Sequence, residues 1–272
     1  PGRLMPGPAQ LRLLWPVLVA LALLLTAVVA AFVHLASRSR VHSTPWDVLL
    51  SQLAAATPWQ GRDLLTILLL TSGALAARSF LGPSTALDVL ALSGTALVAS
   101  LVLARGKPRP FGGPAPFRAA VGQAFVRWLA ILPVLWFAAF AWQIVLGATG
   151  YAPDVQHAIR LFLDADSSAV RIGIFFFAVV LAPLAEETFF RGILLPVLVR
   201  RMGARIGIAL TAAGFAALHA NTGSFVSLAI FSVALSIAYV RTGTLWVPVL
   251  MHALFNAASL ALLLGLARAG MV

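Results

Sequence analysis

The sequence predicts an all-helical, polytopic membrane protein, a bundle of about eight transmembrane helices, and two observations carry that prediction. Of 272 residues, 61% are hydrophobic and only 10% are charged, whereas about a quarter of the residues in soluble domains are charged. The hydrophobic residues also gather in runs of roughly 17 residues or more, the length a helix needs to cross a hydrocarbon core of ~30 Å. No stretch outside these runs is large enough for a soluble domain with its own core.

The charge pattern agrees with this fold class. A net charge of +11 would suggest nucleic-acid binding in a soluble chain. Here, however, Lys and Arg stand mainly at the ends of the apolar runs, where they act as orientation signals. We therefore expect the lipid bilayer, and no nucleic acid, as a partner. The absence of cysteine excludes disulfides, a thiolate nucleophile and a Cys-ligated metal.

The N-terminal portion, residues 1–104, is predicted to hold three spans. The first apolar run exceeds the roughly 7 to 15 residues of a signal-peptide core, so a retained transmembrane helix is expected. The polar stretch 37–62 is expected along the membrane interface. The predicted spans are 11–36, 64–80 and 84–104.

Residues 105–118 are predicted to be a linker, because four basic residues, four prolines and three glycines leave no helix to continue. Residues 119–272 then form the predicted core. Pro183 is expected to kink one of its spans a turn before Glu186 and to free a backbone carbonyl. The five spans predicted in this core are 119–147, 168–201, 203–220, 224–240 and 245–266.

The basic residues also predict a topology. Eleven of the 19 Lys and Arg residues lie in four segments that would share one side of the membrane. The positive-inside rule places that side in the cytoplasm and both termini outside. The Ala, Leu and Arg bias favours a bacterial cytoplasmic (inner) membrane. The four segments are 37–62, 105–118, 200–205 and Arg241.

The only two glutamates of the chain, Glu186 and Glu187, lie side by side in an otherwise apolar run. A charged residue at the centre of a spanning helix costs about 2.5 to 3.5 kcal/mol on insertion scales, so a functional site is expected here. Glu187 and Arg191 are four residues apart and can pair along one helix face. Glu186 points about 100° away and is left free for chemistry or for a partner on another helix.

Two of the five histidines belong to the spans that follow. His219 ends one predicted span, and His252 and Asn256 lie four residues apart inside the last one, hence on one helix face. Imidazole and amide groups in lipid need hydrogen-bond partners, so these side chains are expected to turn inward toward the two glutamates and Arg191.

Two chemistries fit such a cluster, and the sequence leaves both open. In one, Glu186 is a general base that activates water for attack on a peptide carbonyl. His252 and Asn256 then donate to the oxyanion, and His219 orients the water or protonates the leaving amine. In the other, Glu186, His219 and His252 hold a divalent metal such as zinc, whose bound water is activated.

Other intramembrane hydrolase patterns are missing from the chain: it has no H-E-x-x-H, no Gly-x-Ser-Gly and no Gly-x-Gly-Asp. Two non-enzymatic alternatives remain. One is a transporter or a proton- or cation-binding membrane protein, although no inverted repeat with broken helices supports it. The other is a non-catalytic immunity or scaffold protein.

The assembled residues resemble the CPBP family of intramembrane proteases, which includes the Ras-converting CAAX endopeptidases and bacterial Abi-type proteins. The resemblance rests on three motifs in the family's order, within residues 168–266. They are Glu186-Glu187-x-x-x-Arg191, Phe215-x-x-x-His219 and His252-x-x-x-Asn256.

The resemblance implies a helical bundle with an intramembrane catalytic cavity and endopeptidase cleavage of a membrane-anchored protein or peptide. By the resemblance, Glu186 is the catalytic glutamate, Glu187 and Arg191 organise it, and His219, His252 and Asn256 complete the site. Family members have been described both as glutamic and as metalloproteases, so the cofactor is either none or a divalent metal. The substrate does not carry over.

Overall fold

The computed structural model describes residues 46–56, 58–79, 94–102, 117–151, 161–163, 165 and 167–268. The chain divides into two compact units, residues 1–44 and 45–272, and every described residue belongs to the second. The described residues form helices and turns, without a strand among them. This confirms the all-helical class.

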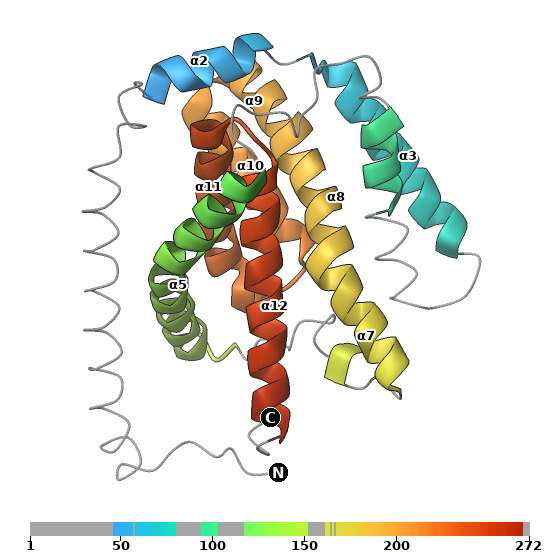
Figure 1. The fold of residues 1–272 in the computed structure, drawn as a ribbon, viewed down its shortest axis with the longest axis vertical. Coiled ribbons are helices and arrows are strands. Elements are labelled where there is room, and N and C mark those ends of the chain that lie inside the picture. Colours follow the sequence, from blue (N-terminus) through green and yellow to red (C-terminus); the bar gives the residue numbers. More distant parts are fainter. Residues whose placement is uncertain are drawn as a thin grey trace. The chain divides into compact units, whose positions relative to one another are not determined.

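The helices follow one another along the chain as labelled in Figure 1. Residues 94–102 also contain a helical segment. The elements are α2 (Trp46–Ala56), α3 (Gly61–Ser79), α5 (Phe117–Ala148), α7 (Ser168–Phe176), η2 (Phe177–Leu181), α8 (Ala182–Phe189), η3 (Phe190–Leu194), α9 (Leu195–Met202), α10 (Ala204–Leu218), η4 (Thr222–Ser224), α11 (Phe225–Thr242) and α12 (Trp246–Arg268).

Four helical runs in the described part of the chain are long and apolar enough to cross a membrane. They confirm four predicted spans and show an integral membrane protein, but the count of about eight is not confirmed. Helix α3 forms where a span was expected, yet it carries three charges. The span predicted at 11–36 and most of the linker lie outside the described residues. The four runs are Phe117–Ala148, Ser168–Met202, Thr222–Thr242 and Trp246–Ala267.

The run Ser168–Met202 is one continuous helix that contains two π-helical turns. A simple kink at Pro183 was predicted instead. Each π-turn, η2 and η3, is followed by a helix with proline in its first two positions. Proline lacks the N–H that would continue the ordinary ladder, so the chain widens there and skips one carbonyl. Glu186 and Glu187 lie on α8, between the two π-turns.

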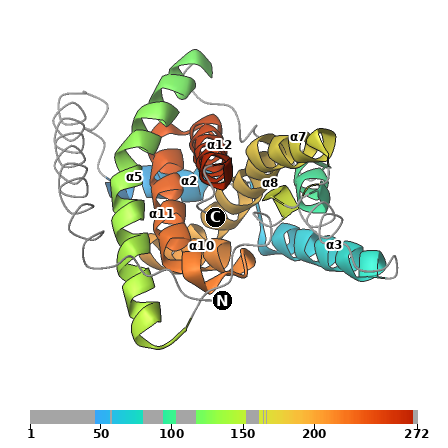
Figure 2. The same cartoon turned by 90° about the horizontal axis from the view of Figure 1, so that it is seen from below.

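The C-terminal helices pack as a bundle around these glutamates. Helix α11 packs against both α5 and α10, and α12 packs against α5 and α8 (Figure 2). A close approach of α9 and α10 depends on Gly207, where a Cβ would lie 2.8 Å from the backbone nitrogen of Val199. Eight buried residues of α5, α11 and α12 form the central apolar cluster, among them Leu135, Phe231 and Met251.

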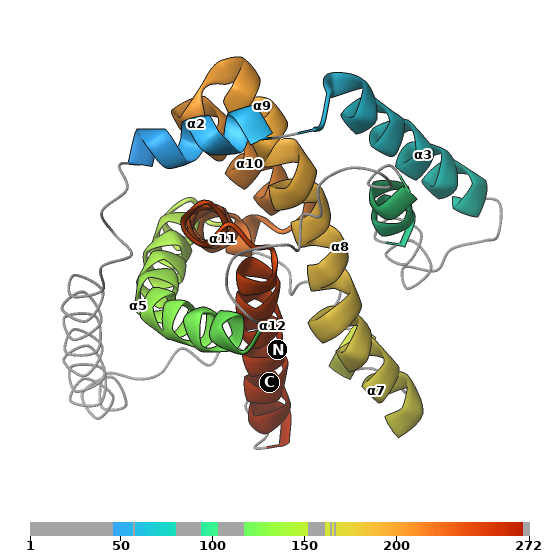
Figure 3. The ribbon, with the colours of Figure 1, turned by 45° about the horizontal axis from the view of Figure 1, so that its top comes forward.

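Ring and hydrogen-bond contacts define the two ends of the bundle. At one end Phe117 of α5 meets Trp246 of α12, with ring centroids 5.1 Å apart. At the other end Trp142 of α5 donates to the carbonyl of Thr222. Helix α2 belongs to the first end, where it crosses the end of α9 (Figure 3) and buries Leu50 against that helix and α11.

Candidate active site

Glu187 and Arg191 form a fully buried ion pair on one face of the α8–η3 helix. Nη1 of Arg191 lies 2.9 Å from Oε1 of Glu187, and both side chains have no exposed surface. The predicted pairing at a spacing of four residues is confirmed. A buried charge without a partner of opposite sign is strongly destabilising. Glu187 and Arg191 therefore each compensate the buried charge of the other.

Arg191 is also bound to α11, which the sequence analysis did not anticipate. Its Nη2 donates to the hydroxyl of Ser232 at 2.6 Å and to the carbonyl of Ser232 at 2.9 Å. Its guanidinium lies 4.8 Å from the ring centroid of Phe215, a favourable cation–π geometry. The hydroxyl of Ser236 donates to the same carbonyl of Ser232. Two buried serines four residues apart in an apolar span were the signal available for this contact.

His252 completes the buried cluster from α12. Its Nδ1 lies 2.9 Å from Oε1 of Glu187, the oxygen that also accepts from Arg191. The imidazole is held edge to face between two phenylalanines, with centroids 5.6 Å from Phe215 and 5.8 Å from Phe231. Since a carboxylate oxygen only accepts, Nδ1 carries a proton and Nε2 is directed elsewhere.

Nε2 of His252 faces Glu186. It lies 4.0 Å from Oε2 of that carboxylate, which is beyond hydrogen-bond distance. Oε2 of Glu186 is buried without a hydrogen-bond partner, although 26% of the side chain is exposed. Glu186 therefore lies next to the histidine that binds Glu187.

His219 reaches the same cluster through Phe215 of its own helix. Its Nδ1 lies 2.8 Å from the carbonyl oxygen of Phe215, and the two rings are 4.8 Å apart. A carbonyl cannot donate, so Nδ1 is the donor in this contact. Phe215 therefore contacts both His219 and His252, and the structure gathers the two histidines around one ring.

Helix α10 is shorter than the span predicted at 203–220. It has 15 residues, a length of about 22 Å at 1.5 Å per residue, which is less than a hydrocarbon core of ~30 Å. His219 is the C-cap of this helix. The turn that follows contains Ala220 at φ 46°, a left-handed conformation that costs a non-glycine residue energy.

Helix α5 supplies hydrogen bonds to this irregular turn. Nε1 of Trp142 donates to the carbonyl of Thr222 at 2.7 Å, and Nε2 of Gln143 donates to the carbonyl of Gly223 at 3.1 Å. The side chain of Asn221 accepts from the backbone of Ser224. These hydrogen bonds satisfy backbone carbonyls that have left the regular helix.

Asn256 is placed on the inward face of α12, as its spacing from His252 predicts. Its Nδ2 donates to the carbonyl of Ala178 at 2.7 Å. That carbonyl lacks a donor in its own helix, because the N–H of Ala182 reaches back to Phe177 and Pro183 has no N–H. The freed carbonyl expected from Pro183 is thus present, and Asn256 satisfies it with one of its two N–H groups.

The proposed metal ligands are not gathered as a set of three. Among the described residues, no group of three His, Asp or Glu side chains is close enough to hold a metal ion. Glu186 and His252 are near neighbours, whereas the hydrogen bond and the ring contact of His219 are both with Phe215. The described residues therefore do not supply the three-ligand set of a catalytic zinc site.

Comparison with known proteins agrees with this arrangement. Residues 168–258, which hold all six candidate site residues, match the family described as "Type II CAAX prenyl endopeptidase Rce1-like". The chain belongs to the CPBP family. The family is one of intramembrane CAAX-type endopeptidases, so protein substrates and embedding in a membrane follow at that level.

A relative in Escherichia coli is similar to about half of the chain and adds no function. It is described as an "Uncharacterized 24.3 kDa protein" and is 33% identical over 158 residues, which cover 51% of this chain and 71% of the relative. No solved structure shows a significant match to the chain.

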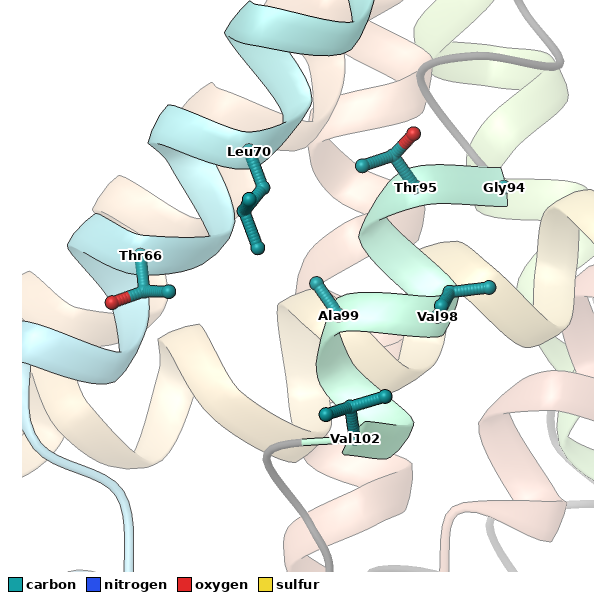
Figure 4. Close-up of a pocket in the computed structure, with 7 residues that line it drawn as sticks. All are labelled: Thr66, Leu70, Gly94, Thr95, Val98, Ala99 and Val102. Carbon is teal, nitrogen blue, oxygen red and sulfur yellow. The ribbon is translucent and has the colours of Figure 1, made fainter.

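One groove lies outside the CPBP-matched residues. It is formed by α3 and the helical segment 94–102, has a volume of about 590 Å³ and is almost wholly apolar (Figure 4). Its lining contains no titratable side chain, so it offers no group for catalysis. The lining residues are Thr66, Leu70, Gly94, Thr95, Val98, Ala99 and Val102.

Proposed function

We propose that the chain is an endopeptidase in which Glu186 activates a water to cleave a peptide bond of a membrane-anchored protein or peptide. The observation that carries the proposal is the buried Oε2 of Glu186, which has no hydrogen-bond partner and lies 4.0 Å from Nε2 of His252. A carboxylate oxygen kept without a partner in a buried site is available to take a proton.

In the proposed reaction, Glu186 takes one proton from the water while the water oxygen attacks the peptide carbonyl carbon. His219 orients that water with the lone pair on Nε2, since its Nδ1 is occupied by the carbonyl of Phe215. When the tetrahedral intermediate collapses, the C–N bond breaks and Glu186 returns the proton to the leaving amine. No net proton is gained or lost by the protein.

The developing oxyanion needs donors, and two groups can serve. Asn256 has a second N–H besides the one bound to Ala178. His252 serves if it carries both protons, with Nδ1–H on Glu187 and Nε2–H toward the oxyanion. Such donors are worth about 2.7 to 4 kcal/mol each.

The test is a comparison of membrane proteomes between cells that carry the wild-type chain and cells that carry Glu186→Gln. The variant keeps the shape of the side chain and removes its basicity, so uncut substrates are expected to accumulate and new N-termini to disappear. Unchanged insertion and unfolding temperature of the purified variant would separate lost chemistry from lost folding. Identical proteomes with full biological effect would instead favour a non-catalytic scaffold.

A further inference from the structure

The arginines of the described residues are distributed unequally between the two ends of the bundle. One end contains the starts of α3, α5, α10 and α12 and the ends of α9 and α11, and we call it the arginine end. Contacts fix this grouping: Arg200 donates to the carbonyl of Trp59, and a Cβ on Gly61 would lie 2.4 Å from the guanidinium of Arg201. Its arginines are Arg62, Arg118, Arg200, Arg201, Arg205 and Arg241.

Among the described residues, the opposite end carries fewer arginines. Arg171 donates to the carbonyls of Phe162 and Ala165. Arg268 is the last residue of α12. Along α3, Arg78 lies at the end remote from Gly61 and is buried. Within the described part of the chain, the asymmetry is therefore one of the number of arginines.

The arginines at the arginine end face outward. Five of the six, all except Arg241, are exposed. Among the described residues, two acidic residues share this end, Asp47 of α2 and Asp63 of α3, and Asp63 accepts from the backbone of Gln60. A guanidinium presents paired N–H donors that match the oxygens of a phosphate.

Helix α2 marks the level of the membrane interface at this end. It crosses the end of α9 and buries Leu50 against α9 and α11, and it therefore caps the bundle instead of extending it. The ring of Trp46 at its start lies 4.9 Å from the guanidinium of Arg241. Tryptophan is enriched at the headgroup level, where the apolar ring and a polar partner are both satisfied.

We propose that the arginine end docks the phosphate headgroups of anionic phospholipids in the cytoplasmic leaflet. Exposed guanidinium groups at headgroup level attract anionic lipid, and each basic residue near such a surface adds about fivefold to the association. The four spans and α2 then fix the protein in the bilayer with α9 and α11 ending, and α10 and α12 beginning, at the cytoplasmic face. This assignment is independent of the proposed peptidase activity.

Lipid retention tests the docking surface directly. The purified full chain in detergent is titrated with dioleoyl phosphatidylglycerol or with dioleoyl phosphatidylcholine, and bound lipids are counted by native mass spectrometry. The wild-type chain is expected to retain the anionic lipid in preference. The triple variant R62Q/R201Q/R205Q is expected to lose that preference by at least about fivefold, while R268Q at the opposite end keeps it.

Two outcomes would overturn the docking surface. One is equal retention of the two lipids by the wild-type chain. The other is an anionic preference that survives in the triple variant. Inorganic phosphate is the competing ligand, and it is expected to leave the unfolding temperature unchanged; stabilisation by phosphate equal to that by phosphatidylglycerol would also contradict a lipid surface.

The leaflet is tested by labelling, which is simple because the chain has no cysteine. A single cysteine in R201C is expected to resist a membrane-impermeant maleimide in intact cells and to react after the cells are opened. Tyr151, exposed at the far end of α5, supplies the matched position, and Y151C is expected to react in intact cells. The reverse pattern would place the arginine end outside and overturn the cytoplasmic assignment.

Discussion

Nδ1 of His252 lies 2.9 Å from the same carboxylate oxygen of Glu187 that accepts from Arg191. This one buried oxygen thus pairs with the Arg191 guanidinium on its own helical run and orients the His252 imidazole on α12. Removal of either partner of the ion pair leaves the other charge buried and uncompensated, a loss of about 3 to 5 kcal/mol. We expect Glu187→Leu and Arg191→Leu each to lower the free energy of unfolding by that amount in detergent.

The double variant Glu187→Leu/Arg191→Leu is the control for this argument. Apolar replacement of both partners removes the uncompensated charge, so most of the stability is expected to return. Cleavage is expected to stay lost, because His252 no longer has its partner on Nδ1. A double variant less stable than either single variant would contradict the account.

Ser232 gives a second prediction. Its hydroxyl accepts from Nη2 of Arg191 at 2.6 Å, and a hydrogen bond to a charged group contributes about 1.5 to 3 kcal/mol. Ser232→Ala is expected to lower the free energy of unfolding by that amount. Ser236→Ala removes a hydroxyl from the same helix that does not touch Arg191, so it is the matched control and is expected to cost less. Equal losses would show that the contact with Arg191 is unimportant.

The sequence predicted those parts of the site that depend on helical spacing alone. Glu187 and Arg191 pair because residues four apart share a face, and His252 and Asn256 share a face for the same reason. The expected convergence on the glutamates is confirmed for His252, through its contact with Glu187. The assignment of catalytic roles stays a prediction.

Other features depended on tertiary detail that spacing does not contain. The π-turn at η2 shifts the helix phase, so the partner of Asn256 is Ala178 and could not be derived from the sequence. Helix α10 ends at Leu218, and the turn that follows His219 accepts hydrogen bonds from α5 residues 80 positions away, which spacing along the chain does not predict. Ser232 was missed because a serine in an apolar helix usually bonds to its own backbone.

Metal removal separates the two chemistries left open by the residue types. Because the described residues hold no group of three ligands, cleavage by the purified protein is expected to persist after treatment with phenanthroline. The measurement uses a substrate found in the proteome comparison, with elemental analysis for zinc. Loss of activity on chelation and its return with added zinc would favour the metal-bound water instead.

Asn256 and Pro183 are predicted to be coupled through the carbonyl of Ala178. Asn256→Leu leaves this carbonyl without a donor and is expected to cost about 1 to 3 kcal/mol of unfolding free energy. Pro183→Ala restores a backbone N–H near the π-turn, so the carbonyl regains a partner within its own helix. In that background Asn256→Leu is expected to cost less. Unfolding free energies of the four proteins check the coupling, and strictly additive losses would refute it.

Trp142 is predicted to act on the reaction through the turn that holds His219. Trp142→Phe keeps an aromatic ring but removes the N–H that binds the carbonyl of Thr222 at 2.7 Å. The lost bond is exposed, so its removal is expected to lower stability by only about 0.5 to 1.5 kcal/mol. The turn that contains Ala220, at φ 46°, nevertheless loses one of its two side-chain hydrogen bonds from α5. Displacement of His219 by about 1 Å lowers cleavage by up to ~100-fold, because the water is no longer held for attack.

Trp136 provides the matched control on the same helix. Its side chain is 51% exposed, so Trp136→Phe makes the same chemical change away from the turn and is expected to leave cleavage and stability nearly unchanged. The measurement compares kcat and KM of the two variants, with a fall confined to kcat expected for Trp142→Phe, since a displaced His219 affects the attack on bound substrate more than binding. If both variants cleave at the wild-type rate, α5 has no part in positioning His219.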